Sequence, residues 1–404
     1  MKEIENGVCA PIGFQAAGVH CGIKNNINKN DLGLIFSEKE GSAACIYTTN
    51  KVKGAPILVT REHLENGKAR AILVNSGNAN TCNADGVQIA QAMCQTCAQQ
   101  AGIASDQVMI ASTGVIGQPL PLAPIQEAMP ALVQSLRKEG HTDAAASIMT
   151  TDTFAKEIAV SFTIGDTECK MGGIAKGSGM IRPNMATMLS FVTSDAAITP
   201  ECLRRVLKEV ADETFNMITI DGDTSTNDMF GILCNGMAGN DVIDTTDEKY
   251  EAFKEALLHV CTALSKMLAR DGEGATKLLV SKVTGACSLK DARNVALSVI
   301  GSNLLKCAMF GHDANWGRIL CAIGYADAQL DINRVDVSIQ SKAGCIQVCQ
   351  DGHGVAFDEE KALTILQEEE IEILVTLHDG QATAVAWGCD LTYEYVKING
   401  EYRT

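Results

Sequence analysis

The hydrophobic positions of the chain follow two periods that alternate along its length. Short apolar runs that end in glycine or polar residues predict strands at 71–77, 108–113, 157–165 and 276–285. Segments with apolar residues three and four positions apart predict helices at 86–102, 121–140, 198–215, 249–270 and, as the last, 360–367. Strands and helices that alternate in this way indicate an α/β or α+β fold in which helices cover sheets.

Residues at the ends of these segments set the expected boundaries. Thr199 is placed as an N-cap, with Pro200 as the first helical residue. The helix over 121–140 is expected to end at Gly140, because glycine readily adopts the left-handed conformation found at helix C-termini. The helix over 249–270 is followed by a loop that places Glu273 in front of the next strand.

Composition and charge narrow the class of protein. A chain of 404 residues is long enough for two or three domains. Its net charge of −16, without clustered lysine and arginine, argues against nucleic-acid binding. The sequence contains neither an apolar run of ~18 residues nor the charged-then-apolar order of a signal peptide at its start. We therefore expect no membrane partner and a cytoplasmic location.

The sixteen cysteines are spread through the chain, which favours reduced, mostly buried thiols over a disulfide framework. Cys94 and Cys97 form a close pair on one predicted helix, but the only other close pair, Cys345 and Cys349, has a different spacing. The histidines form no metal-ligand motif, and the glycine-rich segments lack P-loop and dinucleotide-binding spacing. We expect neither a metal nor a cofactor.

The segment Lys176–Leu189, KGSGMIRPNMATML, contains the chemistry of greatest interest. Its two glycines and its proline constrain a loop in which the carbonyl of Ala186 can be pressed towards the Thr187 hydroxyl, the geometry of an N-to-O acyl shift and chain cleavage. Cleavage would free the amine of Thr187, which can then activate its own hydroxyl as a nucleophile. Taken alone, the same pattern is more often a structural glycine-rich turn before a buried strand.

This segment resembles the cleavage and nucleophile motif of the ornithine acetyltransferase (glutamate N-acetyltransferase) family of arginine biosynthesis. Other segments resemble the same family in the same order, at 13–24, 43–56, 74–86, 112–117, 221–228, 271–277, 311–319 and 396–404. The departures are small and do not touch the nucleophile: the family varies at Arg182, and Gly400 and Glu401 stand where alanine and aspartate are more usual.

The resemblance implies a fold of layered sheets sandwiched between helices, with a smaller C-terminal domain from about residue 285. It also implies a precursor that cleaves itself between Ala186 and Thr187. The products would be an α chain, residues 1–186, and a β chain, residues 187–404, with strands of both in one core. Two α and two β chains would form a heterotetramer.

The implied reaction moves an acetyl group from N2-acetylornithine to L-glutamate through an acetyl-Thr187 intermediate. The resemblance assigns the oxyanion hole to Thr113 and the backbone N–H of Gly114. The sequence leaves open whether acetyl-CoA also serves as an acetyl donor. No other cofactor is implied.

The resemblance also assigns residues that bind the amino-acid substrate. Without it, Lys176 and Glu273 would be interpreted as solvated surface charges. With it, Lys176 suits a carboxylate and Glu273 an ammonium group, and the set of binding residues is Thr153, Lys176, Thr187, Glu273, Asn399 and Thr404. Which of Thr150, Thr151 and Thr153 matches the binding threonine of the family stays open; Thr153 is the one assigned here.

Two other functions fit parts of the pattern. A self-cleaving aminopeptidase or amidohydrolase with an N-terminal nucleophile would pass the acyl group to water instead of glutamate. A binding protein without catalytic activity would keep the glycine-rich loop as a structural element and remain a single chain.

Overall fold

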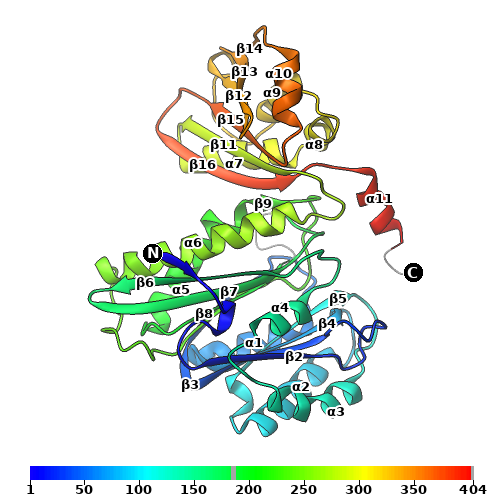
Figure 1. The fold of residues 1–404 in the computed structure, drawn as a ribbon, viewed down its shortest axis with the longest axis vertical. Coiled ribbons are helices and arrows are strands. Elements are labelled where there is room, and N and C mark those ends of the chain that lie inside the picture. Colours follow the sequence, from blue (N-terminus) through cyan, green and yellow to red (C-terminus); the bar gives the residue numbers. More distant parts are fainter. Residues whose placement is uncertain (183–187, 402–404) are drawn as a thin grey trace. The chain divides into compact units, whose positions relative to one another are not determined.

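A computed structural model of the protein describes residues 1–182 and 188–401. The chain divides into two compact units. Unit 1 comprises residues 1–177, 184–212 and 224–264, and unit 2 comprises residues 178–183, 213–223 and 265–404. Each unit contains one mixed sheet with helices packed against it, which confirms the expected mixed α/β class (Figure 1).

The sheet of unit 1 has the order β1-β6-β7-β8-β10-β3-β4-β5, and β2 pairs with β3. Neighbouring strands are antiparallel except β8 with β10 and β4 with β5, which are parallel. The strands are β1 (Lys2–Ile4), β2 (Phe14–Val19), β3 (Leu32–Tyr47), β4 (Lys68–Asn78), β5 (Val108–Val115), β6 (Lys156–Ile164), β7 (Thr167–Lys176), β8 (Leu189–Ser194) and β10 (Met229–Cys234).

Both faces of this sheet are buried, which explains the continuous apolar runs of its strands. Along β4, Ala71 and Leu73 belong to one hydrophobic core, whereas Ile72 and Val74 belong to the other. The sheet combines strands that precede residue 187 with strands that follow it, because β8 and β10 lie between β7 and β3. The two segments on either side of the predicted cleavage site therefore share a core.

Helices cover the sheet of unit 1. Helices α2 and α3 pack side by side, and α1 packs on β5 and α2 (Figure 1). Helix α6 packs on β6 through an edge-to-face contact of Phe162 and Phe253, whose ring centres lie 6.2 Å apart. The helices are α1 (Ala55–His63), α2 (Gly86–Ala101), α3 (Leu122–Gln134), α4 (His141–Ile148), α5 (Pro200–Glu213) and α6 (Glu248–Arg270), whose last turns belong to unit 2. The Thr199 hydroxyl accepts the N–H of Cys202, 3.4 Å away, as expected of an N-cap.

The expected end of the helix over 121–140 is wrong. Helix α3 ends at Gln134, and the chain then turns to pair with β2. Ala16 and Arg137 exchange two backbone hydrogen bonds of 3.1 and 3.2 Å. Gly140 packs so closely on Ala16 that a Cβ atom there would lie 1.8 Å from the Ala16 carbonyl oxygen. This long-range pairing satisfies backbone groups that a longer helix would have used.

The sheet of unit 2 has the order β14-β13-β12-β15-β11-β16-β9. Its strands are β9 (Ile218–Thr219), β11 (Leu278–Ala286), β12 (Asp336–Ser341), β13 (Gly344–Gln350), β14 (His353–Gly354), β15 (Glu370–Thr376) and β16 (Ala382–Cys389). Helix α7 packs on β11 and β16, and α10 packs on β12 and β13. The helices are α7 (Leu289–Gly301), α8 (Asn303–Phe310), α9 (Trp316–Gly324), α10 (Glu359–Leu366) and α11 (Tyr393–Gly400).

The expectation that 360–367 forms the last helix is also wrong, because α11 follows β16. None of its residues is buried, and its sequence has only a weak apolar stripe, the pattern on which helix prediction depends. One of its contacts is between the Phe310 and Tyr393 rings, which meet edge to face with ring centres 5.8 Å apart.

Candidate active site

The two residues predicted to form the oxyanion hole lie at the end of β5, against the end of the parallel strand β4. Thr113 is paired with Ser76 and Gly114 with Gly77. Thr113 is 8% exposed. Gly114 has φ 131°, and a Cβ atom there would lie 2.3 Å from the carbonyl carbon of Gly77. The close approach of the two strands therefore requires glycine at this position.

Hydrogen bonds of buried asparagine side chains fix the end of β5. The Ser112 hydroxyl donates to Asn75 Oδ1 over 2.5 Å. Asn227 Nδ2 donates to the carbonyls of Ser112 and Ala79 over 2.9 and 2.6 Å. The Thr81 hydroxyl in turn donates to Asn227 Oδ1 over 2.6 Å. Buried amides with so many partners hold one conformation, so the asparagine-rich turn at 74–86 and Asn227 support the residues next to them in β5.

Lys176, the last residue of β7, reaches the same place. Its side chain is not the solvated surface charge that its local sequence suggests, because the residue is only 4% exposed. Its Nζ atom donates to Thr113 Oγ1 over 3.3 Å. The fold of unit 1 thus brings together two predicted site residues that lie 63 positions apart in the sequence.

Asp152 is a site residue that sequence reasoning missed. Its Oδ1 atom accepts the N–H of Gly177, directly after Lys176, and the Nζ of Lys156, each over 2.7 Å. The side chains of Asp152 and Lys156 are fully buried. Burial alone would raise the pKa of the Asp152 carboxyl, but the charges of Lys176 and Lys156 outweigh it and hold that pKa well below its usual range.

Thr153 lies next to Asp152 and is exposed. The backbone N–H of Thr150 donates to Asp152 Oδ2 over 2.9 Å, so this carboxylate also shapes the 150–153 segment. The choice of Thr153 over its neighbours as a binding residue stays a prediction. The signal that could have pointed to Asp152 was the lysine four residues after it.

The second group of predicted residues lies in unit 2. Asn399, on α11, donates from Nδ2 to Glu273 Oε2 over 2.7 Å. The backbone N–H of Glu273 donates to the Ser178 carbonyl over 2.7 Å. Gly179 lies against the Glu273 carboxylate, where a Cβ atom would be 2.5 Å from Oε2. The start of the glycine-rich loop is therefore packed directly on a predicted substrate-binding carboxylate.

Asp221 fixes the next part of the same loop. Its carboxylate accepts the backbone N–H groups of Met180, over 2.5 Å, and Ile181, over 3.0 Å. The Tyr395 hydroxyl donates to it over 3.2 Å. Burial and the neighbouring Asp221 charge raise the pKa of Tyr395, so this hydroxyl stays protonated as a donor. Met180 has φ 58°, a left-handed conformation that these bonds stabilise.

Five of the predicted residues thus form two groups, one in each unit. Thr113, Gly114 and Lys176 meet in unit 1, and Glu273 and Asn399 meet in unit 2. Ala186, Thr187 and Thr404 lie outside the described residues.

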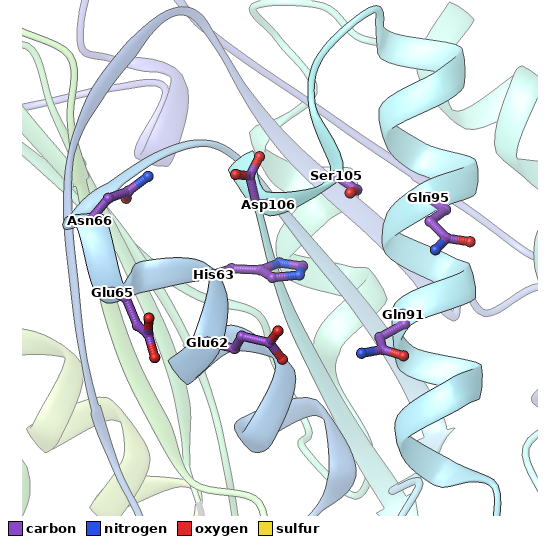
Figure 2. A pocket seen from close by; sticks show the side chains of 8 residues that line it. All are labelled: Glu62, His63, Glu65, Asn66, Gln91, Gln95, Ser105 and Asp106. Atoms are coloured by element: carbon purple, nitrogen blue, oxygen red, sulfur yellow. The ribbon is translucent and has the colours of Figure 1, made fainter.

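A polar pocket of about 530 Å³ in unit 1 contains none of these residues. Figure 2 shows its side chains, which come from the end of α1, from α2 and from the turns that follow each helix. They are Glu62, His63, Glu65, Asn66, Gln91, Gln95, Ser105 and Asp106.

All sixteen cysteines are free thiols, and nine of them, including Cys94 and Cys97, are buried. Within residues 1–182 and 188–401, no group of three or more His, Cys, Asp or Glu side chains is placed to hold a metal ion. The same ranges contain no helix that is long and apolar enough to cross a membrane.

A mixed α/β protein with a hydroxyl, a glycine-lined turn and a buried ammonium at one strand end is suited to chemistry that develops negative charge on a substrate oxygen. Comparison with known proteins identifies the family. A model of the ArgJ family matches residues 15–404. The chain therefore belongs to the ArgJ family of arginine biosynthesis, and this confirms the family resemblance seen in the sequence.

Two relatives illustrate the similarity. The chain is 50% identical over 406 residues to the arginine biosynthesis bifunctional protein ArgJ of Symbiobacterium thermophilum, with 100% of both chains covered. It is 50% identical over 392 residues to the arginine biosynthesis bifunctional protein ArgJ 1 of Clostridium acetobutylicum, with 97% of this chain and 96% of that protein covered. The protein is accordingly an acetyltransferase of arginine biosynthesis.

A solved structure agrees with the assignment. A chain in the crystal structure of ArgJ from Bacillus halodurans is 45% identical to this one, with a TM-score of 0.51. The match covers 53% of this chain and 99% of that chain.

Proposed function

We propose that the protein transfers acetyl from N2-acetylornithine to L-glutamate through Thr187. The Thr187 Oγ atom forms a bond to the acetyl carbon, the bond from that carbon to the ornithine nitrogen breaks, and the freed amine leaves with a proton supplied through the Thr187 amine. The glutamate amine then attacks the acetyl-threonine ester and restores the hydroxyl. The alternative function is that of an amidohydrolase, in which water takes the place of glutamate as the acetyl acceptor.

The observation that carries this proposal is the cluster at the end of β5. A tetrahedral intermediate needs donors aimed at its oxyanion. Thr113 and Gly114 follow one another at the end of β5, and the buried Lys176 Nζ atom lies 3.3 Å from Thr113 Oγ1. These features support the oxyanion-hole assignment made from the sequence.

The contacts in unit 2 support a role in binding the amino group of the substrate. Asn399 Nδ2 donates to the half-buried Glu273 carboxylate over 2.7 Å, and Gly179 packs against the same carboxylate without a side chain that would displace it. A carboxylate in this setting can pair with the ammonium of ornithine. We propose that Thr153, Lys176, Thr187 and Thr404 also bind the substrate, as the family resemblance implies.

We propose that the working enzyme consists of two chains, residues 1–186 and 187–404, assembled as two copies of each. The Bacillus halodurans chain corresponds to about half of this chain, as expected of one product of a cleavage near the middle. The shared sheet of unit 1 would hold the two products together after cleavage. We place the enzyme in the cytoplasm, where sixteen free thiols would stay reduced.

We also propose that acetyl-CoA serves as a second acetyl donor. The relatives are named bifunctional, and a second acetyl donor would give the enzyme a second activity. Glutamate acetylation measured in separate reactions with N2-acetylornithine and with acetyl-CoA should proceed with both donors. Activity with N2-acetylornithine alone would restrict the enzyme to recycling acetyl groups.

The order of substrates gives a kinetic prediction. Because ornithine and glutamate would use one set of binding residues in turn, we expect ping-pong kinetics. Initial rates against N2-acetylornithine at several fixed glutamate concentrations should give parallel double-reciprocal lines. Labelled acetyl recovered as acetate at the same rate without glutamate would instead favour the amidohydrolase.

The glycine at the end of β5 gives a second prediction. Gly114→Ala should lower turnover by about 10²-fold, because a displacement near 1 Å at a reacting group has an effect of that size, and the new Cβ atom would lie 2.3 Å from the Gly77 backbone. Gly117→Ala is the matched control, because Gly117 also has a positive φ, 78°, but no atom within 4 Å of the added methyl. A Gly114→Ala protein with unchanged turnover would remove this strand end from the site.

A further inference from the structure

The hydrogen bond between Lys176 and Thr113 has a fixed direction. A lysine ammonium has only donors, so Thr113 Oγ1, 3.3 Å from Nζ, must accept. The hydrogen of the Thr113 hydroxyl is then available for another acceptor. Within the part of the chain that the structure describes, no hydrogen bond donated by this hydroxyl is formed.

We propose that Lys176 acts on the reaction through Thr113, as a positioning residue that orients and polarises the oxyanion-hole hydroxyl, in addition to any contact with the substrate carboxylate. The proposal rests on the proposed function, since it needs Thr113 to donate to the oxyanion. A hydroxyl whose oxygen accepts from a cation becomes a stronger donor, because hydrogen bonds in a chain polarise one another.

The surroundings of Lys176 favour this role. The backbone directly after it is fixed by the bond of 2.7 Å from the Gly177 N–H to Asp152 Oδ1. Lys156 Nζ also donates to Asp152 Oδ1 over 2.7 Å, and the side chains of both residues are fully buried. These two hydrogen bonds to Asp152 fix the backbone at the end of β7, and they therefore fix the Cα atom from which the Lys176 side chain extends.

The charged side chains around Lys176, those of Asp152 and Lys156, also favour this role. Two lysines, Lys156 and Lys176, lie near one aspartate, Asp152, and their charges hold the pKa of its carboxyl well below its usual range despite burial. Buried charges are screened less than exposed ones, and Lys176 and Lys156 are 4% and 0% exposed. A buried lysine at the end of β7, in contact with Thr113, favours an oxyanion over a neutral carbonyl.

The experiment compares two acetyl donors that differ only in the carboxylate. N-acetyl-1,4-diaminobutane is N2-acetylornithine with hydrogen in place of the carboxylate. Single-turnover formation of acetylated enzyme is followed by intact mass, after cleavage of each variant has been verified. The variants are Lys176→Met, Thr113→Val and the double variant. Lys277→Met is the matched control, since Lys277 is an equally buried lysine, 4% exposed, that donates to a backbone carbonyl.

Lys176→Met should slow acetylation by both donors, by about 10-fold or more, because one charge-assisted contact to the hydroxyl is lost. In the Thr113→Val background the same change should have less than about a twofold effect on the donor without a carboxylate, since coupled residues do not add. Lys277→Met should react like the unmodified enzyme. A loss confined to N2-acetylornithine would overturn the proposal and leave Lys176 as a carboxylate ligand only.

A second variant covers the case in which Lys176→Met does not mature. Lys176→Arg keeps a cation with hydrogen-bond donors, and any rate difference between arginine and lysine should disappear in the Thr113→Val background. A difference that persists there would also overturn the proposal. If unmodified enzyme is acetylated by neither donor, the proposed function fails, and that result is distinct from either of these.

Discussion

Thr187→Ala protein should remain a single chain of full length and should transfer no acetyl group. The hydroxyl is needed twice in this account, first to attack the Ala186 carbonyl during cleavage and then to carry the acetyl group. Intact mass of the denatured protein reports the cleavage, and glutamate acetylation reports the transfer. The unmodified protein should appear as two fragments, with Thr187 at the new N-terminus.

Thr187→Ser is the matched control for this change. Serine keeps the hydroxyl and loses only a methyl group, so this variant should still cleave and still transfer acetyl, at a lower rate. Unmodified protein that stays uncut after prolonged incubation in its folded state would contradict self-cleavage. Such a result would favour a single-chain protein whose glycine-rich loop is structural.

Thr113→Val should lower kcat by roughly 10²-fold or more, the scale measured for a single oxyanion-hole donor. Valine has the shape of threonine and suits the β5 position, so the fold should be retained. Thr113→Ser keeps a hydroxyl for Lys176 to contact and should lose much less activity. Circular dichroism and the two-fragment pattern verify folding and maturation. An unchanged kcat in Thr113→Val would remove this hydroxyl from the site.

The local sequence was sufficient for elements whose ends are set by nearby residues. The strands that end near Gly77 and Thr113 and the helix that begins at Pro200 follow from apolar runs, glycine and a capping threonine. The end of α3 could not be predicted in this way, because the pairing of Arg137 with Ala16 joins residues far apart in the sequence. Helix α11 was missed because none of its residues is buried and its apolar face is weak.

The site shows the same division. Residue types suggested a nucleophile and an oxyanion hole, and the family resemblance supplied the positions. The burial of Lys176 and its contact with Thr113 depend on the order of strands in the sheet of unit 1. Asp152 and Asn227 were not singled out because their roles are indirect. They hold backbone segments of the site, and only the folded chain shows which segments those are.

We propose that Thr187 carries the acetyl group between the two substrates. Enzyme mixed with N2-acetylornithine, quenched in acid without glutamate and analysed by intact mass should carry one acetyl group on the 187–404 chain. Fragment analysis should place this group on Thr187, and addition of glutamate before the quench should remove it as N-acetylglutamate. Absence of an acetylated chain, together with intersecting double-reciprocal lines, would show direct transfer between two bound substrates without an acetyl-Thr187 intermediate.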